Sequence, residues 1–108
     1  MFLPRETPLM ATWMMFTVPC PTPSGETADQ LLQKRIDGIT PEMQTSARDL
    51  GCTFHRAWVT SDRSAFVAVA CWTTSEGGRT FYERWQIQSE EGETATILEG
   101  DVGLVPLG

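Results

Sequence analysis

The sequence has few residues with which to bind a metal or cross-link the chain. Its one histidine is His55, and its three cysteines, Cys20, Cys52 and Cys71, show neither a CxxC motif nor a Cys/His spacing. Such a set does not make a zinc site, and an odd number of scattered cysteines does not indicate a disulfide framework. We therefore expect no metal site and three reduced thiols, as is usual for a cytoplasmic protein.

Positive charge is also scarce. The chain has 8 Lys and Arg residues against 14 Asp and Glu residues, which gives a formal net charge of -6 at pH 7. No basic patch is therefore available to neutralise the phosphates of a nucleic acid or an anionic membrane surface. No apolar run approaches the ~20 residues of a membrane span. The sequence also has no nucleophile elbow, Walker loop or dinucleotide fingerprint. We expect neither a nucleic-acid nor a membrane partner, and no cofactor.

The most informative segment is Gly51–Thr74, where two runs rich in β-branched and aromatic residues flank the polar break 61–64. This pattern predicts a β-hairpin in which Trp58 lies opposite Val67. Side chains alternate between the two faces of a strand. One face is predicted to carry Phe54, Arg56, Trp58, Val67, Val69 and Cys71. The other is predicted to carry Thr53, His55, Ala57, Val59, Phe66, Ala68, Ala70 and Trp72. Neither face is polar, so both require a cover, and a one-residue slip in register would scramble the two sets.

The residues before the hairpin predict an extension, a strand and a broken helix. Met1–Leu9 contains two prolines and no apolar period, and is interpreted as an N-terminal extension to a single domain at residues 10–108. Ala11–Val18 is apolar on both faces, which favours a buried central strand. A proline-rich loop follows, and helical signals begin near Thr27. Leu31, Leu32 and Ile36 predict one apolar stripe. A break near Gly38 separates this helix from a second helical piece, Pro41–Leu50.

The residues after the hairpin predict one more helix and one more strand. Thr74 or Ser75 is expected to cap a helix that runs to about Ile87. The alternative is a strand at Thr80–Gln88, which would make the C-terminal half an antiparallel meander. A last strand is expected within Ala95–Leu107. The element order is then β-α-β-β-α-β, a ferredoxin-like α+β fold with a four-stranded antiparallel sheet.

Several segments together resemble the dimeric α/β-barrel superfamily, in particular its small bacterial families of unknown function. They are the proline-rich loop after the first strand, a helix that ends in ARDLG, the run HRAWVTSDRSAFVAVACW and the closing EGDVGLVPL. The resemblance covers about residues 11–107. It implies a homodimer in which two four-stranded sheets pack face to face. Members of this superfamily include cofactor-free monooxygenases, polyketide cyclases, haem-degrading enzymes and chlorite dismutases, so the fold alone does not assign a reaction. Members that use haem generally place a histidine on or near a helix, whereas His55 falls on a predicted strand.

His55 is the candidate catalytic residue, because an imidazole exchanges protons near neutral pH. Its predicted face carries small residues such as Ala68, which would leave space beneath the helices. The candidate substrate-binding residues are Trp72, Phe66 and Trp13 as aromatic walls, Ala68, and Tyr82 as a hydrogen-bond donor. In the competing interpretation the alanines let a helix approach closely, and His55 is merely hydrogen-bonded at an edge.

Arg56 lies on the other predicted face, between Phe54 and Trp58. A buried arginine needs a carboxylate partner, which Asp101 or an acid of a second subunit would supply. We interpret Arg56 as part of a dimer-interface salt bridge, with anion binding as the alternative.

These observations favour a homodimeric small-molecule-binding protein with a pocket between sheet and helices. The leading hypothesis is a cofactor-independent enzyme, a monooxygenase, cyclase or isomerase, acting on a small aromatic or polyketide-like substrate. The alternative is a non-enzymatic dimer that binds a ligand or a partner protein.

Overall fold

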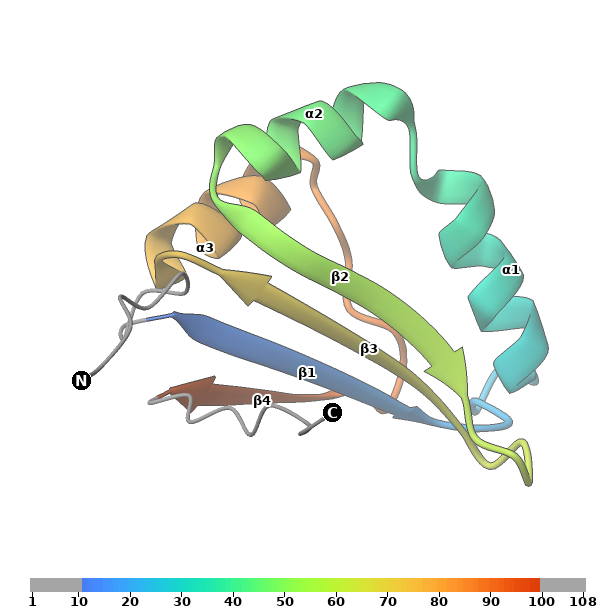
Figure 1. Ribbon diagram of the computed structural model, residues 1–108. Helices are drawn as coiled ribbons and strands as arrows, with labels where there is room; N and C mark the ends of the chain where they lie inside the picture. Colours follow the sequence, from blue (N-terminus) through green and yellow to red (C-terminus); the bar gives the residue numbers. More distant parts are fainter. Residues whose placement is uncertain (1–10, 100–108) are drawn as a thin grey trace, which may run out of the picture.

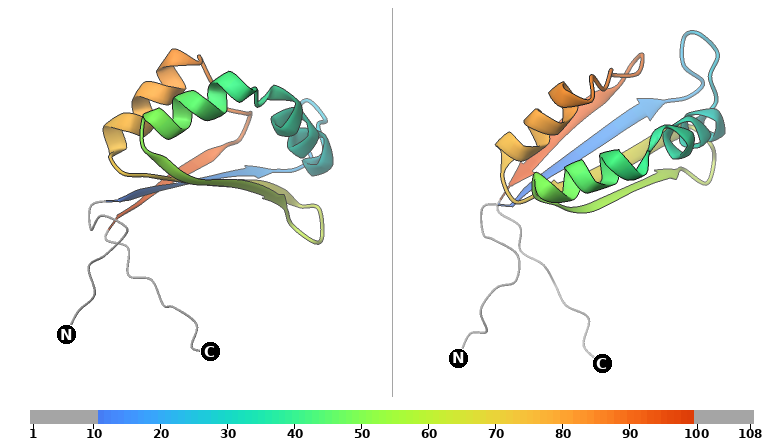
Figure 2. Two further views of the ribbon diagram at one scale, coloured as in Figure 1. Left: turned by 45° about the horizontal axis from the view of Figure 1, so that its top comes forward. Right: turned by 90° about the horizontal axis from the view of Figure 1, so that it is seen from above.

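The computed structural model describes residues 11–99 and forms one sheet covered on one face by helices (Figure 1). The elements are β1 (Thr12–Pro19), α1 (Ala28–Gly38), α2 (Pro41–Asp49), β2 (Cys52–Val59), β3 (Ala65–Trp72), α3 (Ser75–Arg84) and β4 (Thr94–Glu99). The strands pair antiparallel in the order β2-β3-β1-β4. All three helices lie on the same side of the sheet (Figure 2). The predicted ferredoxin-like α+β fold is therefore confirmed. The predicted extension Met1–Leu9 lies outside the described residues, as does Asp101.

Side-chain caps set where the helices begin. Thr27 and Gln30 form a reciprocal capping box at the start of α1, and the Thr40 hydroxyl accepts a hydrogen bond from the Met43 N–H at the start of α2. Each cap satisfies backbone N–H groups that have no partner within the helix. The predicted break between these two helices is confirmed at Ile39, which is extended.

Helix α3 forms as predicted but ends earlier than predicted. Thr74 caps it, and it stops at Arg84 rather than near Ile87. The chain turns there because Gln86 adopts a left-handed conformation, with φ of 51°. The alternative of a strand at Thr80–Gln88 is wrong.

The register of the hairpin matches the predicted one. Trp58 lies opposite Val67 and His55 opposite Ala70, so the two predicted faces are preserved from Phe54 onward, but not at Thr53. The ladder is interrupted by an irregularity between Cys52 and Phe54, which places Cys52 opposite Trp72. A bulge of this kind inserts one unpaired residue and changes which side chains share a face.

The core lies between the sheet and the helices. Its buried residues form two clusters: Val18, Ala28, Leu31, Phe66 and Ala68, and Met14, Ala70, Trp72 and Phe81. Glycines let α3 approach closely. A β-carbon at Gly77 would overlap the carbonyl oxygen of Leu50, and one at Gly78 would lie 2.7 Å from Cε of Met14.

The apolar stripe predicted for α1 is only partly correct. Leu31 is buried and Leu32 half-buried, but Ile36 is 57% exposed. Ile36 follows Leu31 by five residues, which places it about 140° around the helix, away from the sheet.

The opposite face of the sheet, which we call the open face, has no helical cover among residues 11–99. It carries Phe54, Trp58 and Leu98, which are exposed, together with Arg56. Trp13 also lies on this face, so the prediction that it walls the space beneath the helices is wrong. Its position follows from its pairing with Cys71, because alternate residues of β1 face opposite sides. The Trp13 ring packs 5.4 Å from that of Phe54, measured between centroids. No helix among these residues has the length and hydropathy needed to cross a bilayer.

Candidate functional site

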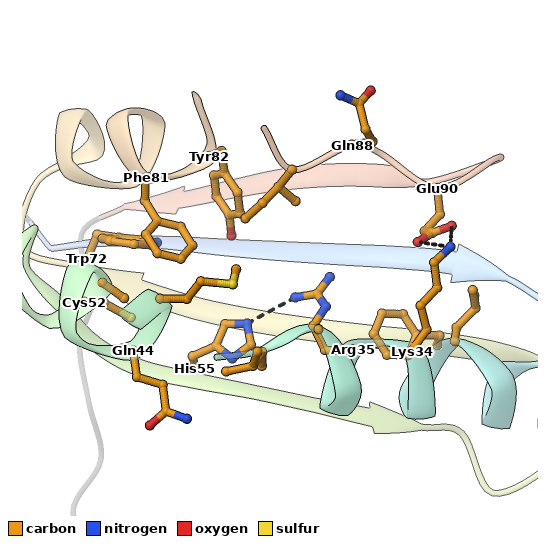
Figure 3. A pocket seen from close by; sticks show the side chains of 17 residues that line it. Lys34, Arg35, Gln44, Cys52, His55, Trp72, Phe81, Tyr82, Gln88 and Glu90 are labelled. Atoms are coloured by element: carbon orange, nitrogen blue, oxygen red, sulfur yellow. Dashed lines mark hydrogen bonds and ion pairs between the residues drawn. The ribbon is translucent and has the colours of Figure 1, made fainter. Parts of the chain in front are cut away.

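A cavity of about 330 Å³ lies between the helices and the β2–β3 side of the sheet (Figure 3). Its volume falls in the range of ~300–1,000 Å³ that is usual for small-molecule sites. Its aromatic lining consists of Phe66, Trp72, Phe81 and Tyr82, and its aliphatic lining of Leu31, Ile39, Met43, Ala47 and Ile87. The lining therefore suits an apolar ring. A second, more open hollow lies between α3 and β4, and Tyr82 borders both.

The aromatic end of the cavity is closely packed. Trp72 is 1% exposed and forms part of the floor. Its ring centroid lies 5.4 Å from that of Phe81, and the Phe81 ring in turn lies 5.7 Å from that of Tyr82 in an edge-to-face contact. Offset and edge-to-face pairs are the preferred aromatic geometries. A flat ligand would meet preformed walls here.

The polar centre of the cavity is a contact between β2 and α1. Nε2 of His55 lies 3.2 Å from Nη1 of Arg35 (Figure 3). A guanidinium has only N–H donors, so Nε2 must be the acceptor. The imidazole is therefore neutral, with its proton on Nδ1.

Burial lowers the pKa of His55, and the positive charge of Arg35 lowers it further. The residue as a whole is exposed because β2 is an edge strand, whereas its ring faces the cavity. Both causes disfavour the charged imidazolium. His55 is therefore a neutral base at neutral pH.

Arg35 has no carboxylate partner within 4.0 Å among residues 11–99, in contrast to its neighbour Lys34. Lys34 lies 3.1 Å from a Glu90 carboxylate oxygen and 3.6 Å from one of Glu26. The hydrogen bond to Glu90 raises the pKa of Lys34. This ion pair joins α1 to the loop before β4 and borders one end of the cavity (Figure 3). The Arg35 guanidinium instead lies over the Phe66 ring, 5.6 Å from its centroid.

Tyr82 places a hydroxyl inside the cavity. Figure 3 shows its phenol oxygen pointing down from α3 into the space. Burial raises the pKa of Tyr82 to about 12. The phenol stays protonated at neutral pH and is able to donate a hydrogen bond to a ligand.

The structure gathers most of the predicted site residues but not all of them. His55, Phe66, Trp72 and Tyr82 line the cavity, as expected. Ala68 is only 1% exposed and packs in the core, so its small side chain admits close packing there. For Ala68 the competing interpretation, close approach of a helix, fits the structure better.

Arg35 and Phe81 are among the groups at the site that the sequence reasoning missed. A signal for Arg35 was present, since it follows the buried Leu31 by four residues and so shares its helix face. Arg56 lies exposed on the open face, and its suggested partner Asp101 is outside the described residues. Within residues 11–99, no group of three or more His, Cys, Asp or Glu residues is arranged to hold a metal ion.

The sheet order and the helices on one face define a ferredoxin-like α+β domain. No protein-family model matches the chain, and no curated protein matches its sequence. Solved structures share the fold.

One is a monooxygenase from the gene ActVA-Orf6 of Streptomyces coelicolor in complex with the ligand Nanaomycin D. It has a TM-score of 0.61 and 15% identity, over 91% of this chain and 94% of that chain. Another is a dimeric ferredoxin-like protein from an uncultured marine organism. It has a TM-score of 0.65 and 9% identity, over 91% of this chain and 94% of that chain. At these identities the likeness establishes the fold alone.

Proposed function

We propose that this chain forms a homodimer that binds a small aromatic or polyketide-like molecule and acts on it without a cofactor. The observation that carries the proposal is the cavity itself, which has aromatic walls and a neutral imidazole projecting into it. The solved monooxygenase of similar fold is described in complex with the ligand Nanaomycin D, which supports a ligand-binding role.

His55 would be the proton-transfer group. Oxygenation, cyclisation and isomerisation of such substrates share a first step, the removal of a proton from a hydroxyl or from a carbon beside a carbonyl. The lone pair of Nε2 would take that proton. Arg35 occupies this lone pair in the structure, so an incoming substrate would have to displace the guanidinium.

Filling the cavity should abolish ligand binding without unfolding the protein. Ala47 lines the cavity, whereas Ala68 is packed in the core. We expect Ala47→Leu to remove the rise in melting temperature that hydroxynaphthalenes and small aromatic ketones give in the native chain. Ala68→Leu, the matched control, should instead lose about 1–3 kcal/mol of unfolding free energy through overpacking. Thermal melts with and without these ligands would measure both. If no ligand in the panel shifts the melt of the native chain, the cavity does not bind aromatic molecules.

The open face of the sheet supports the homodimer. Exposed aromatic and aliphatic side chains gather there around Phe54, Trp58 and Leu98. Contiguous apolar surface of this kind is costly in water and is typical of an interface. The solved ferredoxin-like protein of similar fold is described as dimeric.

Trp58→Ala should weaken this dimer. Trp58 is 44% exposed on the open face, and truncation of a central interface tryptophan commonly costs about 2 kcal/mol or more of association free energy. Ile36→Ala is the matched control, because Ile36 is also exposed but lies on α1, away from the open face. Sedimentation equilibrium of both variants would measure the dissociation constants. A native mass near 12.0 kDa at micromolar concentration would rule out the dimer.

A further inference from the structure

The cavity contains an uncompensated positive charge. Arg35 is half-buried, and within residues 11–99 no carboxylate lies within 4.0 Å of its guanidinium. Its neighbours are the neutral His55 ring at 3.2 Å and the face of Phe66 at 5.6 Å. The aromatic face attracts the cation only weakly and provides no negative charge.

Within residues 11–99, Arg48, Arg56, Arg79 and Arg84 also have no carboxylate within 4.0 Å, but they are exposed to water, whereas Arg35 is half-buried. The protein has 14 Asp and Glu residues for 8 Lys and Arg residues. Arg63 is paired with Asp29, and Lys34 is paired with two glutamates. Burying a charged group costs free energy unless an opposite charge offsets the loss of water. A half-buried arginine that has no carboxylate partner among residues 11–99 and lines a largely apolar cavity is therefore placed to receive an anionic ligand.

We infer that the cavity takes an aromatic ligand bearing an acidic oxygen, a phenolate, enolate or carboxylate, which would bind between Arg35 and His55. The inference rests on the proposed function and specifies the ligand class. The ring of the ligand would lie against Phe66 and Trp72, and its oxygen would accept hydrogen bonds from Nη1 of Arg35 and from the Tyr82 hydroxyl. Hydrogen bonds from a charged donor to an anionic oxygen are about twice as strong as neutral ones.

The same position explains how a weakly acidic substrate would lose its proton. A hydroxyl bound there would offer its proton to Nε2 of His55 while Arg35 turns to the oxygen that becomes negative. The proton moves from the oxygen to the imidazole, and the O–H electron pair stays on the oxygen. The titratable groups around this position are Lys34 and Arg35 of α1, Cys52 and His55 of β2, Tyr82 of α3, and Glu90.

Two nearly isosteric ligands test the inference directly. At pH 7, 1-naphthoic acid carries a negative charge and 1-naphthamide does not. Calorimetric titration of the native chain should show that the carboxylate binds roughly 10- to 100-fold more tightly than the amide, the usual range for a hydrogen bond to a charged group. Equal affinities would overturn the inference and leave the proposed function standing. If neither compound binds and no hydroxynaphthalene binds, both the inference and the proposed function are wrong.

The phenolate form has its own probe, 4-nitro-1-naphthol, whose ionised form absorbs visible light. Binding between Arg35 and His55 should lower the pKa of the bound phenol, so colour should appear at a lower pH than for the free compound. A pKa that is unchanged or raised on binding would count against the inference. The two probes together separate a carboxylate site from a phenolate or enolate site.

Arg35→Met removes the charge and keeps an apolar side chain of similar reach. It should abolish the preference for naphthoate over naphthamide and the shift in nitronaphthol ionisation. Arg48→Met is the matched control, because Arg48 is exposed in the last turn of α2 and does not line the cavity. Equal losses in both variants would show a general charge effect and contradict the inference. Should Arg35→Met fail to fold, the comparison of the two ligands on the native chain decides alone.

Discussion

Proton removal from a bound aromatic ketone should slow by about 10²–10⁴ when His55 is replaced by alanine, the usual contribution of a positioned general base. His55 is the only histidine of the chain, and its Nε2 lone pair points toward Nη1 of Arg35 in the cavity. The measurement is deuterium exchange at the carbon beside the carbonyl of 2-tetralone in D₂O, followed by mass spectrometry. This exchange measures proton removal, the proposed first step, and does not depend on which reaction follows it.

The pH dependence of this exchange gives a second readout. A base acts in its deprotonated form, so the rate should rise as pH increases through the pKa of His55 and then level off. Because burial and Arg35 lower that pKa, the plateau should begin below the pH at which an ordinary histidine, with a pKa of 6.5, becomes neutral. Ligand affinity should change much less than the rate in His55→Ala, since the apolar walls supply most of the binding. Unchanged exchange in that variant would leave the non-enzymatic binding protein as the better description.

Gly77→Ala should destabilise the protein, although alanine normally favours a helix over glycine by roughly 1 kcal/mol. Gly77 lies in the first turn of α3, where its N–H is bonded to the Thr74 hydroxyl at 3.0 Å. A β-carbon there would overlap the backbone carbonyl oxygen of Leu50, at the end of α2. A backbone atom cannot rotate away as a side chain does, so α3 would have to move. We expect a loss of about 1–3 kcal/mol of unfolding free energy in urea titrations.

Gly38→Ala is the matched control for this prediction. Gly38 ends α1, and a β-carbon there would meet no atom within 4 Å. That variant should be neutral or slightly more stable, because alanine restricts the unfolded chain. If Gly77→Ala proves as stable as Gly38→Ala, the close approach of α3 to the end of α2 is wrong.

The sequence predicted the hairpin well because its signal is local. Two alternating runs around a polar break define a register, and that register placed His55, Phe66 and Trp72 on one face. Trp13 was misplaced because Ala11–Val18 is apolar on both faces, so no alternation shows which residues face the helices. Its side is decided by pairing with β3, a contact far away in the sequence.

The position of the cavity could not be predicted from the sequence patterns of single helices and strands. Small residues on the sheet predicted space above Ala68, but helix α1 packs against that alanine. The space opens instead around Gly38, Ile39 and Met43, where α1 gives way to α2. Whether two successive helices leave a gap depends on the angle between them, which no pattern in either helix specifies. Arg35 was passed over for a related reason: a charged residue on a helix is usually solvated, and only its register with Leu31 distinguishes it.

The contact between Nε2 of His55 and Nη1 of Arg35 also bears on how a turnover would end. Once His55 has taken a proton, two cations would stand where a donor and an acceptor stood 3.2 Å apart. Like charges at that separation repel, so the protonated imidazole is tolerated only while an anion lies between the two side chains. In the proposed reaction, once the bound oxygen has lost its negative charge, this repulsion would drive the proton off Nε2, either onto the product or into water. The resting pair would then re-form, and one imidazole would suffice for repeated cycles without a second acid.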